Sequence, residues 1–362
     1  MRNGLTNAKR AGRRGDAAIA RLRRSSCAAP GFSRRRRGRG FEYRDADGER
    51  IDDPEVIERI AGLAIPPAWR DVWICMDPLG HLQATGRDAA GRKQYLYHER
   101  WRSHRDRLKF DTMLAFGKAL PRLRRRVSRE LGSSSAPLTA EDLIEERVLA
   151  CAVRLLDVGF FRIGSDDYAE RNESYGLTTL LREHVTITGG SMIFDYRAKS
   201  GQRRVQEITD AGALAVVAAL RRRRAGQQLL AYRTARGWSD VAAADVNEYI
   251  KRHMSEVFSA KDFRTWNASV LAAVALAATD PRDVSGPARE RAVRDAVRTV
   301  SAYLGNTPAV CRTAYIDPRV IDRFHAGHTI AETLGHAGDL ARPRERTRIE
   351  AAVLELLSDA DT

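Results

Sequence analysis

Strand signals and helix signals occupy separate stretches of this chain, and this separation restricts the fold class. Alternating apolar residues and turn dipeptides occur between Phe41 and Tyr97 and again between Glu183 and Ile208. Apolar residues recur at helical spacing over residues 99–131 and 139–156, and from Thr209 to the end of the chain. We therefore expect an α+β protein, with a small β-rich N-terminal part and a larger, mostly helical part that contains a three-stranded β meander.

The first strand-rich segment carries clear turn and cap signals. Asp47-Gly48 is a hairpin dipeptide. Asp53-Pro54 is typical of a helix start, because aspartate accepts from free backbone N–H groups and proline fits the first helical position. Residues 72–76 and 81–85 are expected to be strands on either side of a turn. A small sheet with one short helix follows.

The end of this segment has residues that suit DNA contact. Residues 86–97 read GRDAAGRKQYLY, with glycine turns and basic residues before Gln94, Tyr95 and Tyr97. Glutamine reads adenine edges, and lysine and tyrosine contact phosphates and sugars, so Lys93 joins them as a candidate. A strand with an aromatic core face explains the same residues about equally well.

Positive charge is concentrated at the N-terminus. Residues 1–40 hold thirteen Lys or Arg and one acid, Asp16, so they carry +12 of the formal net charge of +15 and the rest of the chain carries +3. The run Arg34 to Arg37 has no hydrophobic period, and we expect residues 1–38 to be a disordered basic tail. We interpret the tail as an arm that binds a polyanion; a solvated tail or a targeting peptide is the alternative.

Cysteine usage and the length of apolar runs indicate the compartment. The four cysteines, Cys27, Cys75, Cys151 and Cys311, are scattered, with no Cys-x-x-Cys pair and no His at ligand spacing. Neither a zinc site nor a disulfide framework is expected, and reduced thiols are typical of the cytosol. No apolar run approaches the ~18 residues that a membrane span requires. We expect a soluble, cytoplasmic protein.

Four segments of the larger part carry residues that could act on phosphate. Arg162 lies in FRIG, a setting that suits either a buried ion pair or a rigid phosphate contact. Lys199 is expected at a hairpin tip, where most lysines are simply exposed. Lys261 and Arg264 lie one turn apart at a helix start, where a bound anion would offset their conflict with the helix dipole. Tyr315 lies beside a turn, where most tyrosines pack with a solvated hydroxyl.

Taken in order, these segments resemble type IB DNA topoisomerases of the small bacterial and poxvirus kind. The resemblance starts near Phe41 and runs close to the C-terminus, so the basic tail lies outside it. The motifs that carry it are Phe161-Arg162-Ile163-Gly164, Lys199-Ser200-Gly201, Lys261-Asp262-Phe263-Arg264, Gly305-Asn306-Thr307-Pro308 with Tyr315, and, in the smaller part, Ile65-Pro66-Pro67-Ala68-Trp69 and Gln94-Tyr95-Leu96-Tyr97. Each motif is weak alone, and their common order makes the resemblance specific.

The resemblance implies a fold and a domain arrangement. It implies the catalytic fold shared by tyrosine recombinases and type IB topoisomerases, in a clamp around duplex DNA. The N-terminal domain would cover 39–104 and the catalytic domain 105–362, with the junction near His104. The segment Gly132 to Pro137, which is the best linker by composition, would then be a loop within the catalytic domain.

The resemblance also implies a role for each site residue. Tyr315 would attack a backbone phosphorus and keep the 3′-phosphate as a covalent ester. Arg162 and Arg264 would hold the non-bridging oxygens, and Lys199 would protonate the leaving 5′ oxygen. Asn306 would add a hydrogen bond to a non-bridging oxygen, where poxvirus and eukaryotic members carry histidine. Lys261 would contact DNA.

The function implied is the relaxation of positive and negative supercoils without ATP, metal or other cofactor. Duplex DNA would be the partner of a monomer in the nucleoid. A tyrosine recombinase is the alternative, although recombinases typically carry a His-x-x-Arg box where Lys261-Asp262-Phe263-Arg264 stands. A DNA-binding protein without catalysis is a third interpretation, and it would form no covalent adduct.

Overall fold

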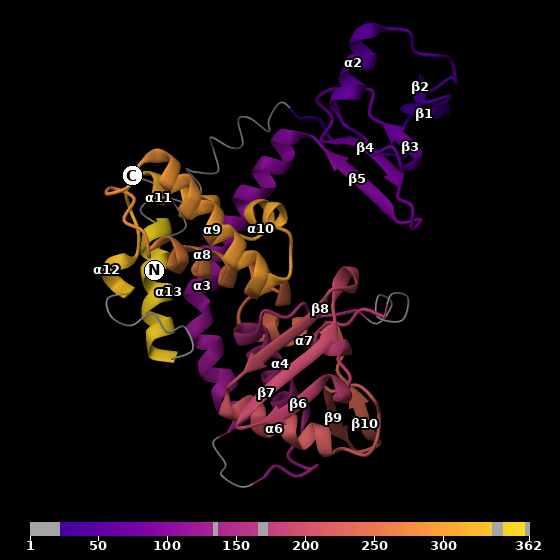
Figure 1. The fold of residues 1–362 in the computed structure, drawn as a ribbon. Helices are drawn as coiled ribbons and strands as arrows, with labels where there is room; N and C mark the ends of the chain where they lie inside the picture. Colours follow the sequence, from indigo (N-terminus) through magenta and orange to yellow (C-terminus); the bar gives the residue numbers. More distant parts are fainter. Residues whose placement is uncertain (1–21, 133–136, 166–172, 335–342, 359–362) are drawn as a thin grey trace, which may run out of the picture. The chain divides into compact units, whose positions relative to one another are not determined.

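The computed structural model describes residues 22–132, 137–165, 173–334 and 343–358. The chain divides into two compact units, Met1–Lys109 and Phe110–Thr362. The division falls inside helix α3 (Glu99–Leu131), and the junction expected near His104 lies in the same helix (Figure 1). Each unit has its own hydrophobic core, so each is described separately.

The first unit is a small antiparallel sheet with one helix. Its strand order is β2-β1-β3-β4-β5. The strands are β1 (Phe32–Arg37), β2 (Gly40–Arg44), β3 (Arg70–Ile74), β4 (Leu82–Arg87) and β5 (Lys93–Tyr97). Helix α2 (Pro54–Gly62) begins as expected, with the Asp53 side chain accepting from Glu55 N at 2.9 Å. Ile60 of α2 packs with Ile74 and Ala84 to form the core of this unit.

The prediction of a disordered tail through residue 38 is wrong for the arginine run, which forms strand β1. The Arg34 guanidinium donates to the carbonyls of Ile65, Pro66 and Trp69, at 3.1, 2.9 and 2.8 Å. It also lies 4.1 Å from the centroid of the Phe41 ring. Since side chains alternate along a strand, Arg36 shares the face of Arg34, while Arg35 and Arg37 extend from the opposite face. The part of the tail before residue 22 lies outside the described residues.

The second unit combines the expected meander with helices. The three strands pair in the order β6-β7-β8 (Figure 1). They are β6 (Val185–Thr188), β7 (Ser191–Arg197) and β8 (Arg203–Ile208). The α-helices after α3 are α4 (Glu145–Gly159), α6 (Ala211–Arg222), α7 (Ala243–His253), α8 (Ala260–Leu276), α9 (Gly286–Leu304), α10 (Pro308–Ala314), α11 (Pro318–His325), α12 (Ala331–Leu334) and α13 (Pro343–Ser358).

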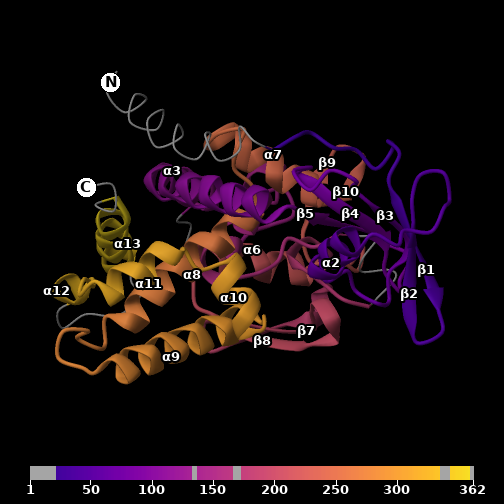
Figure 2. The ribbon, with the colours of Figure 1, turned by 90° about the horizontal axis from the view of Figure 1, so that it is seen from above.

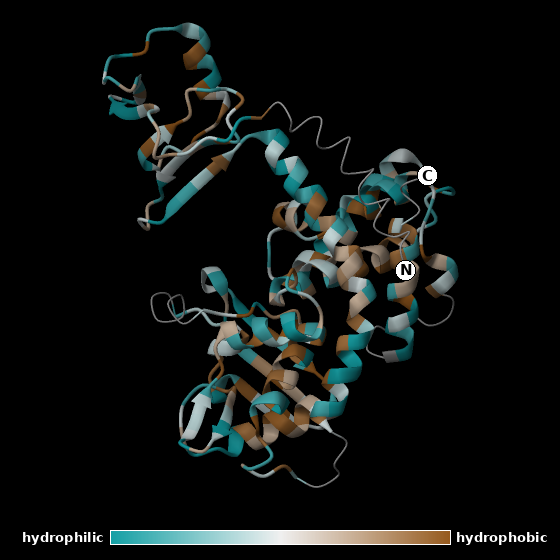
Figure 3. Cartoon of the chain, turned by 180° about the vertical axis from the view of Figure 1, so that it is seen from behind, coloured by the Kyte–Doolittle hydropathy of each residue, from teal (hydrophilic) through white to brown (hydrophobic). Residues whose placement is uncertain are grey.

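Helix α8 is the centre of this unit and is buried along most of its length. Trp266 is fully buried, and it packs so closely on α3 that a Cβ atom on Gly117 would lie 2.6 Å from its ring. Figure 3 shows hydrophobic residues gathered in the interior of this unit and hydrophilic residues along its outer helices. A helix packed on all sides is a rigid platform for the residues that it carries.

Two details of the second unit differ from the sequence-based expectation. The chain is not helical throughout after Thr209, because β9 (Ala231–Thr234) and β10 (Gly237–Asp240) form a two-stranded sheet. Asp142 accepts from Thr139 N and Oγ1, both at 2.8 Å, as a capping pair does, yet α4 begins only at Glu145. The reason is a distant contact: the carbonyl of Leu143 accepts from Arg233 N of β9 at 2.8 Å, which draws this turn out of helical geometry.

The α+β prediction is confirmed by a β-sheet unit that precedes a helical unit with its own meander. The four cysteines are free thiols. Within the described ranges, no helix is both long and apolar enough to cross a membrane. The serine-rich residues 133–136 of the expected loop lie outside the described residues.

Candidate active site

The site is built around Asn306, in the short connection between α9 and α10. Helix α9 ends where Gly305 adopts the left-handed conformation, with φ of 59°. The Asn306 N–H donates back to Ser301 O at 3.2 Å, and Thr307 accepts from Val310 N to begin α10. Hydrogen bonds on both sides therefore hold the backbone at Asn306 in place.

Two arginines from different elements meet at the side chain of Asn306. Its Oδ1 accepts from Arg162 Nη2 at 2.9 Å and from Arg264 Nη2 at 2.8 Å. Arg264 lies on the central helix α8 and is only 4% exposed. Arg162 follows α4, where Phe160 turns the chain with φ of 54° and Phe161 is buried against Phe194, at 5.0 Å between ring centroids. Since Oδ1 accepts from both guanidiniums, the amide NH₂ of Asn306 faces away and is available as a donor.

The two guanidiniums are held by neutral acceptors. Arg162 also donates to Gly305 O, and Arg264 donates to Phe160 O and to Leu304 O at 2.8 Å. Among the described residues, neither guanidinium forms an ion pair with a carboxylate, and Arg264 Nε has no hydrogen-bond partner. Burial and the nearby Arg162 charge lower the pKa of Arg264 to about 10, so it remains cationic at neutral pH. Two cations in contact through neutral groups form a site that favours an anion.

Tyr315 lies against Arg264, one of these two arginines. It is the residue that ends α10, and the Arg264 guanidinium lies 5.4 Å from the centroid of its ring. Its carbonyl lies 3.4 Å from Ser269 Oγ of α8, which also accepts from Asp317 N at 2.9 Å. Asp317 then begins α11 by accepting from Arg319 N. The backbone around Tyr315 is thus attached to the helix that carries Arg264.

Lys199 is the one predicted catalytic residue that this cluster does not include. It lies in the β7–β8 hairpin, in a turn where Ser200 has φ of 66°, and its side chain is exposed. In the described part of the chain, no hydrogen bond or ion pair joins it to Arg162, Arg264, Asn306 or Tyr315. The structure therefore brings together four of the five predicted catalytic residues.

Comparisons with known proteins show which family the chain belongs to. The family described as eukaryotic DNA topoisomerase I, catalytic core, matches residues 98–330, more than half of the chain. The chain belongs to the type IB DNA topoisomerase family. The bacterial DNA topoisomerase IB N-terminal domain family matches residues 40–88. DNA topoisomerase 1B of Acanthamoeba polyphaga mimivirus is 29% identical over 293 residues, which cover 79% of this chain and 85% of the viral protein.

The catalytic-core match spans all five candidate catalytic residues of this type IB topoisomerase, from Arg162 to Tyr315. Lys261 lies in the first turn of α8 with its side chain exposed. Lys261 and Arg264 were expected to need a bound anion at this helix start, because their charges oppose the helix dipole. The Asp262 carboxylate supplies a negative charge there, since it accepts from Ser259 N at 2.7 Å and caps the helix. A DNA contact by Lys261 stays a prediction.

The topoisomerase's predicted DNA contacts in the N-terminal unit fall on two faces of β5. Lys93, Tyr95 and Tyr97 alternate along one face, with the rings of Tyr95 and Tyr97 stacked at 6.3 Å and Tyr95 49% exposed. Gln94 faces the other way and donates to Asp88 at 2.9 Å. The exposed tyrosine face fits DNA contact better than a buried core face does, while Gln94 must leave Asp88 before it can read a base.

Sequence reasoning missed a group of contacts beneath the topoisomerase site. Arg204 and Gln206 of β8 donate to the backbone carbonyls that end α9 and α4. The signal available was the alternation of residues along the last strand of the expected meander. That pattern places both side chains on one face but does not reveal which carbonyls they meet.

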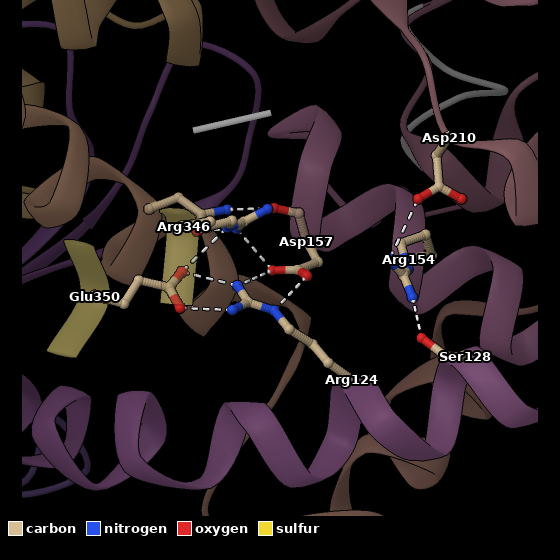
Figure 4. Close-up of polar contacts among 8 residues, drawn as sticks. Arg124, Ser128, Arg154, Asp157, Asp210, Arg346 and Glu350 are labelled. Atoms are coloured by element: carbon tan, nitrogen blue, oxygen red, sulfur yellow. Dashed lines mark hydrogen bonds and ion pairs between the residues drawn. The ribbon is translucent and has the colours of Figure 1, made fainter. Parts of the chain in front are cut away.

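A buried ion network supports the end of α4, the helix that leads to Arg162. Asp157 accepts from Arg124 of α3 and from Arg346 of α13, each at 2.8 Å, and Glu350 of α13 pairs with both arginines (Figure 4). These ion pairs outweigh burial and lower the pKa of Asp157 to about 2. Helix α13 lies beyond the residues that the catalytic-core family matches, so this topoisomerase holds α4 in place with an element outside the matched core.

Proposed function

We propose that this type IB topoisomerase relaxes supercoiled DNA of either sign by cutting one strand through Tyr315 and then rejoining it. The observation that carries the proposal is the contact of two cationic guanidiniums through neutral acceptors beside the Tyr315 ring. A DNA phosphodiester bound there would supply the negative charge that the described site lacks.

The cleavage step exchanges one phosphoester bond for another. The Tyr315 oxygen attacks the phosphorus and loses its proton to solvent, while the bond from phosphorus to the 5′ oxygen breaks. Arg162, Arg264 and the free amide of Asn306 bind the non-bridging oxygens and stabilise the charge that develops in the transition state. Lys199 protonates the departing 5′ oxygen, which requires the β7–β8 hairpin to approach bound DNA.

Rejoining follows from the same chemistry in reverse. Because a phosphodiester is replaced by a phosphotyrosyl diester, the bond energy is kept and neither ATP nor a metal ion is required for religation. Between the two steps the free 5′ end can rotate about the intact strand. This rotation relaxes positive and negative supercoils alike.

We propose that the two units bind duplex DNA as a clamp and that the protein acts as a monomer. The catalytic domain would begin within α3, and the tyrosine face of β5 would contact the DNA in the N-terminal domain. Charge supports this assignment, since Arg87 and Lys93 pair across β4 and β5 on the same face as Tyr95.

The experiment is a plasmid relaxation assay without ATP and with a chelator present. Wild-type protein should relax both negatively and positively supercoiled plasmid, and Tyr315→Phe should relax neither while binding duplex DNA with nearly unchanged affinity. A strict requirement for a divalent metal, or relaxation by Tyr315→Phe, would contradict the mechanism.

A further inference from the structure

Strand β8 connects the two helix ends that carry the site. The Arg204 guanidinium donates to Ala302 O at 3.1 Å and to Tyr303 O at 2.6 Å, at the end of α9. Gln206 lies two positions further along β8, on the same face of the strand. Its Nε2 donates to the carbonyl oxygen of Gly159, which is the last residue of α4. The loop after α4 holds Arg162, and the turn after α9 holds Asn306. In the views of Figures 1 and 2, β8 accordingly lies beside the end of α9.

The fit of Arg204 to this turn is close. A Cβ atom on Gly305 would lie 2.7 Å from Arg204 Nη1, so the guanidinium passes directly over the glycine that precedes Asn306. Gly305 also has φ of 59°, a conformation that glycine adopts without strain. The turn and the arginine therefore depend on each other.

The contacts of Arg204 also have an electrostatic consequence. The carbonyl end of a helix carries partial negative charge, which would repel a phosphate bound at Asn306. At the end of α9, Arg204 donates hydrogen bonds to the carbonyls of Ala302 and Tyr303, and Arg264 donates to the carbonyl of Leu304. These two cations offset the partial negative charge of the helix end. Burial lowers the pKa of Arg204, as expected for a guanidinium that is removed from water and bonded to backbone oxygens.

We propose that Arg204 is a positioning residue for strand cleavage, which holds the Gly305–Asn306 turn so that Asn306 can bridge Arg162 and Arg264. Arg204 acts through Asn306 and does not itself react with DNA. The inference rests on the proposed cleavage chemistry.

The first test measures single-turnover cleavage of a labelled duplex at saturating protein. Arg204→Met should slow covalent adduct formation by roughly 10-fold to 100-fold, the usual effect of misplacing a catalytic group by about an ångström. Duplex affinity should change little, and Arg204→Lys should recover part of the rate, because an ammonium can reach one of the two carbonyls. The matched control is Arg203→Met, which removes the same charge from the same strand but from the exposed pair with Asp195. It should cleave within about twofold of wild type.

A double-mutant cycle separates positioning from general damage to the fold. If Arg204 acts through Asn306, Arg204→Met should cost less than about threefold in an Asn306→Ala background, because the group to be positioned is already missing. Full additivity of the two losses, or an equal loss in Arg203→Met, would overturn the proposal. If Arg204→Met does not fold, the same cycle with Arg204→Lys decides the question.

A sulfur-substituted substrate shows whether Arg204 acts instead through the Lys199 hairpin, which β8 follows directly. When the 5′ bridging oxygen is replaced by sulfur, the leaving group needs no proton, so the Lys199→Ala defect should shrink. The Arg204→Met defect should persist on that substrate, and its disappearance would overturn the assignment to Asn306. Failure of the proposed function itself would appear differently, as the absence of any adduct with wild-type protein.

Discussion

The chemistry of the site depends on Asn306, because its one amide oxygen accepts hydrogen bonds from two arginines. An amide suits this position because its oxygen has two lone pairs for the guanidiniums and its NH₂ remains for a phosphate oxygen. A carboxylate at this position would form ion pairs with both arginines. It would neutralise the positive charge that attracts a phosphate. The neutrality of Asn306 is therefore part of the mechanism.

This reasoning predicts opposite effects on stability and activity for Asn306→Asp. The variant should raise the melting temperature, because a carboxylate pairs with both guanidiniums. It should cut single-turnover cleavage by roughly 10²-fold or more, since one donor is removed and negative charge is introduced. Asn306→Ala should lose a similar amount of activity without the gain in stability, and Asn306→His should keep most activity because an imidazole N–H can donate to the phosphate.

The comparison of cleavage rates and melting temperatures checks these expectations. Asn306→Ala with wild-type activity would show that Asn306 is only a turn residue before Thr307-Pro308. The site would then rest on Arg162, Lys199, Arg264 and Tyr315.

At the scale of helices and strands, local signals in the sequence predicted well and long-range contacts were not predictable. Asp53 caps the helix that it was expected to cap, because a cap involves only the next few residues. The Thr139–Asp142 pair forms but does not begin α4, because Arg233 competes for the carbonyl of Leu143. The prediction of a helix boundary fails where a residue of a distant strand donates to a carbonyl at the helix end.

The supporting contacts of the site show the same limit. Arg204 and Ala302 are 98 positions apart in the sequence, and Arg124 and Glu350 are 226 apart. No periodicity or spacing relates such residues. The catalytic residues could be named in advance only through motifs that resemble a family, and their geometry, above all the shared oxygen of Asn306, required the fold.

The ion pairs of Asp157 with Arg124 and Arg346, which hold the end of α4, lead us to expect a stability that depends on pH. The pKa of Asp157 is lowered to about 2 in the folded chain, against about 3.9 for an unfolded aspartate. Its stabilisation is therefore complete above pH 4 and is lost as pH falls from 4 towards 2, and it amounts to roughly 2 to 3 kcal/mol. Asp157→Asn should be less stable than wild type by about that amount at pH 7, and the difference should shrink below pH 4.

Urea unfolding followed by circular dichroism at pH 7, 4 and 3 measures this difference. The matched control is Asp195→Asn, which removes a carboxylate from the exposed pair with Arg203. Its unfolding midpoint should remain near that of wild type. A stability loss in Asp157→Asn that does not change with pH would show that the ionised carboxylate is not the source.

At the scale of the whole molecule, positive charge is concentrated near the N-terminus, and part of this basic segment is folded. Strand β1 places part of the arginine run within the N-terminal sheet, so removal of residues 1–38 would disrupt that sheet. The segment 1–21 precedes it and holds six basic residues, Arg2, Lys9, Arg10, Arg13, Arg14 and Arg21. The polyanion-binding arm is best tested with this shorter segment.

Removal of residues 1–21 should weaken duplex binding and lower its salt dependence without changing the cleavage rate in a preformed complex. For every DNA phosphate that the protein no longer neutralises, the slope of log affinity against log salt should fall by roughly 0.9. A full-length variant with the six basic residues replaced by glutamine is the matched control, and it should behave like the truncation. An unchanged slope in both would show that this segment does not touch DNA.

The central claim is that Tyr315 becomes covalently joined to the 3′ phosphate of a cut strand. The most direct measurement is a denaturing gel of the protein mixed with a duplex that is labelled on one strand, at either the 5′ or the 3′ end. With wild-type protein, the 5′ label should migrate with the protein and the 3′ label should not, and Tyr315→Phe should give no labelled protein. A protein-linked label from the 3′ end, or a covalent adduct with Tyr315→Phe, would contradict the account.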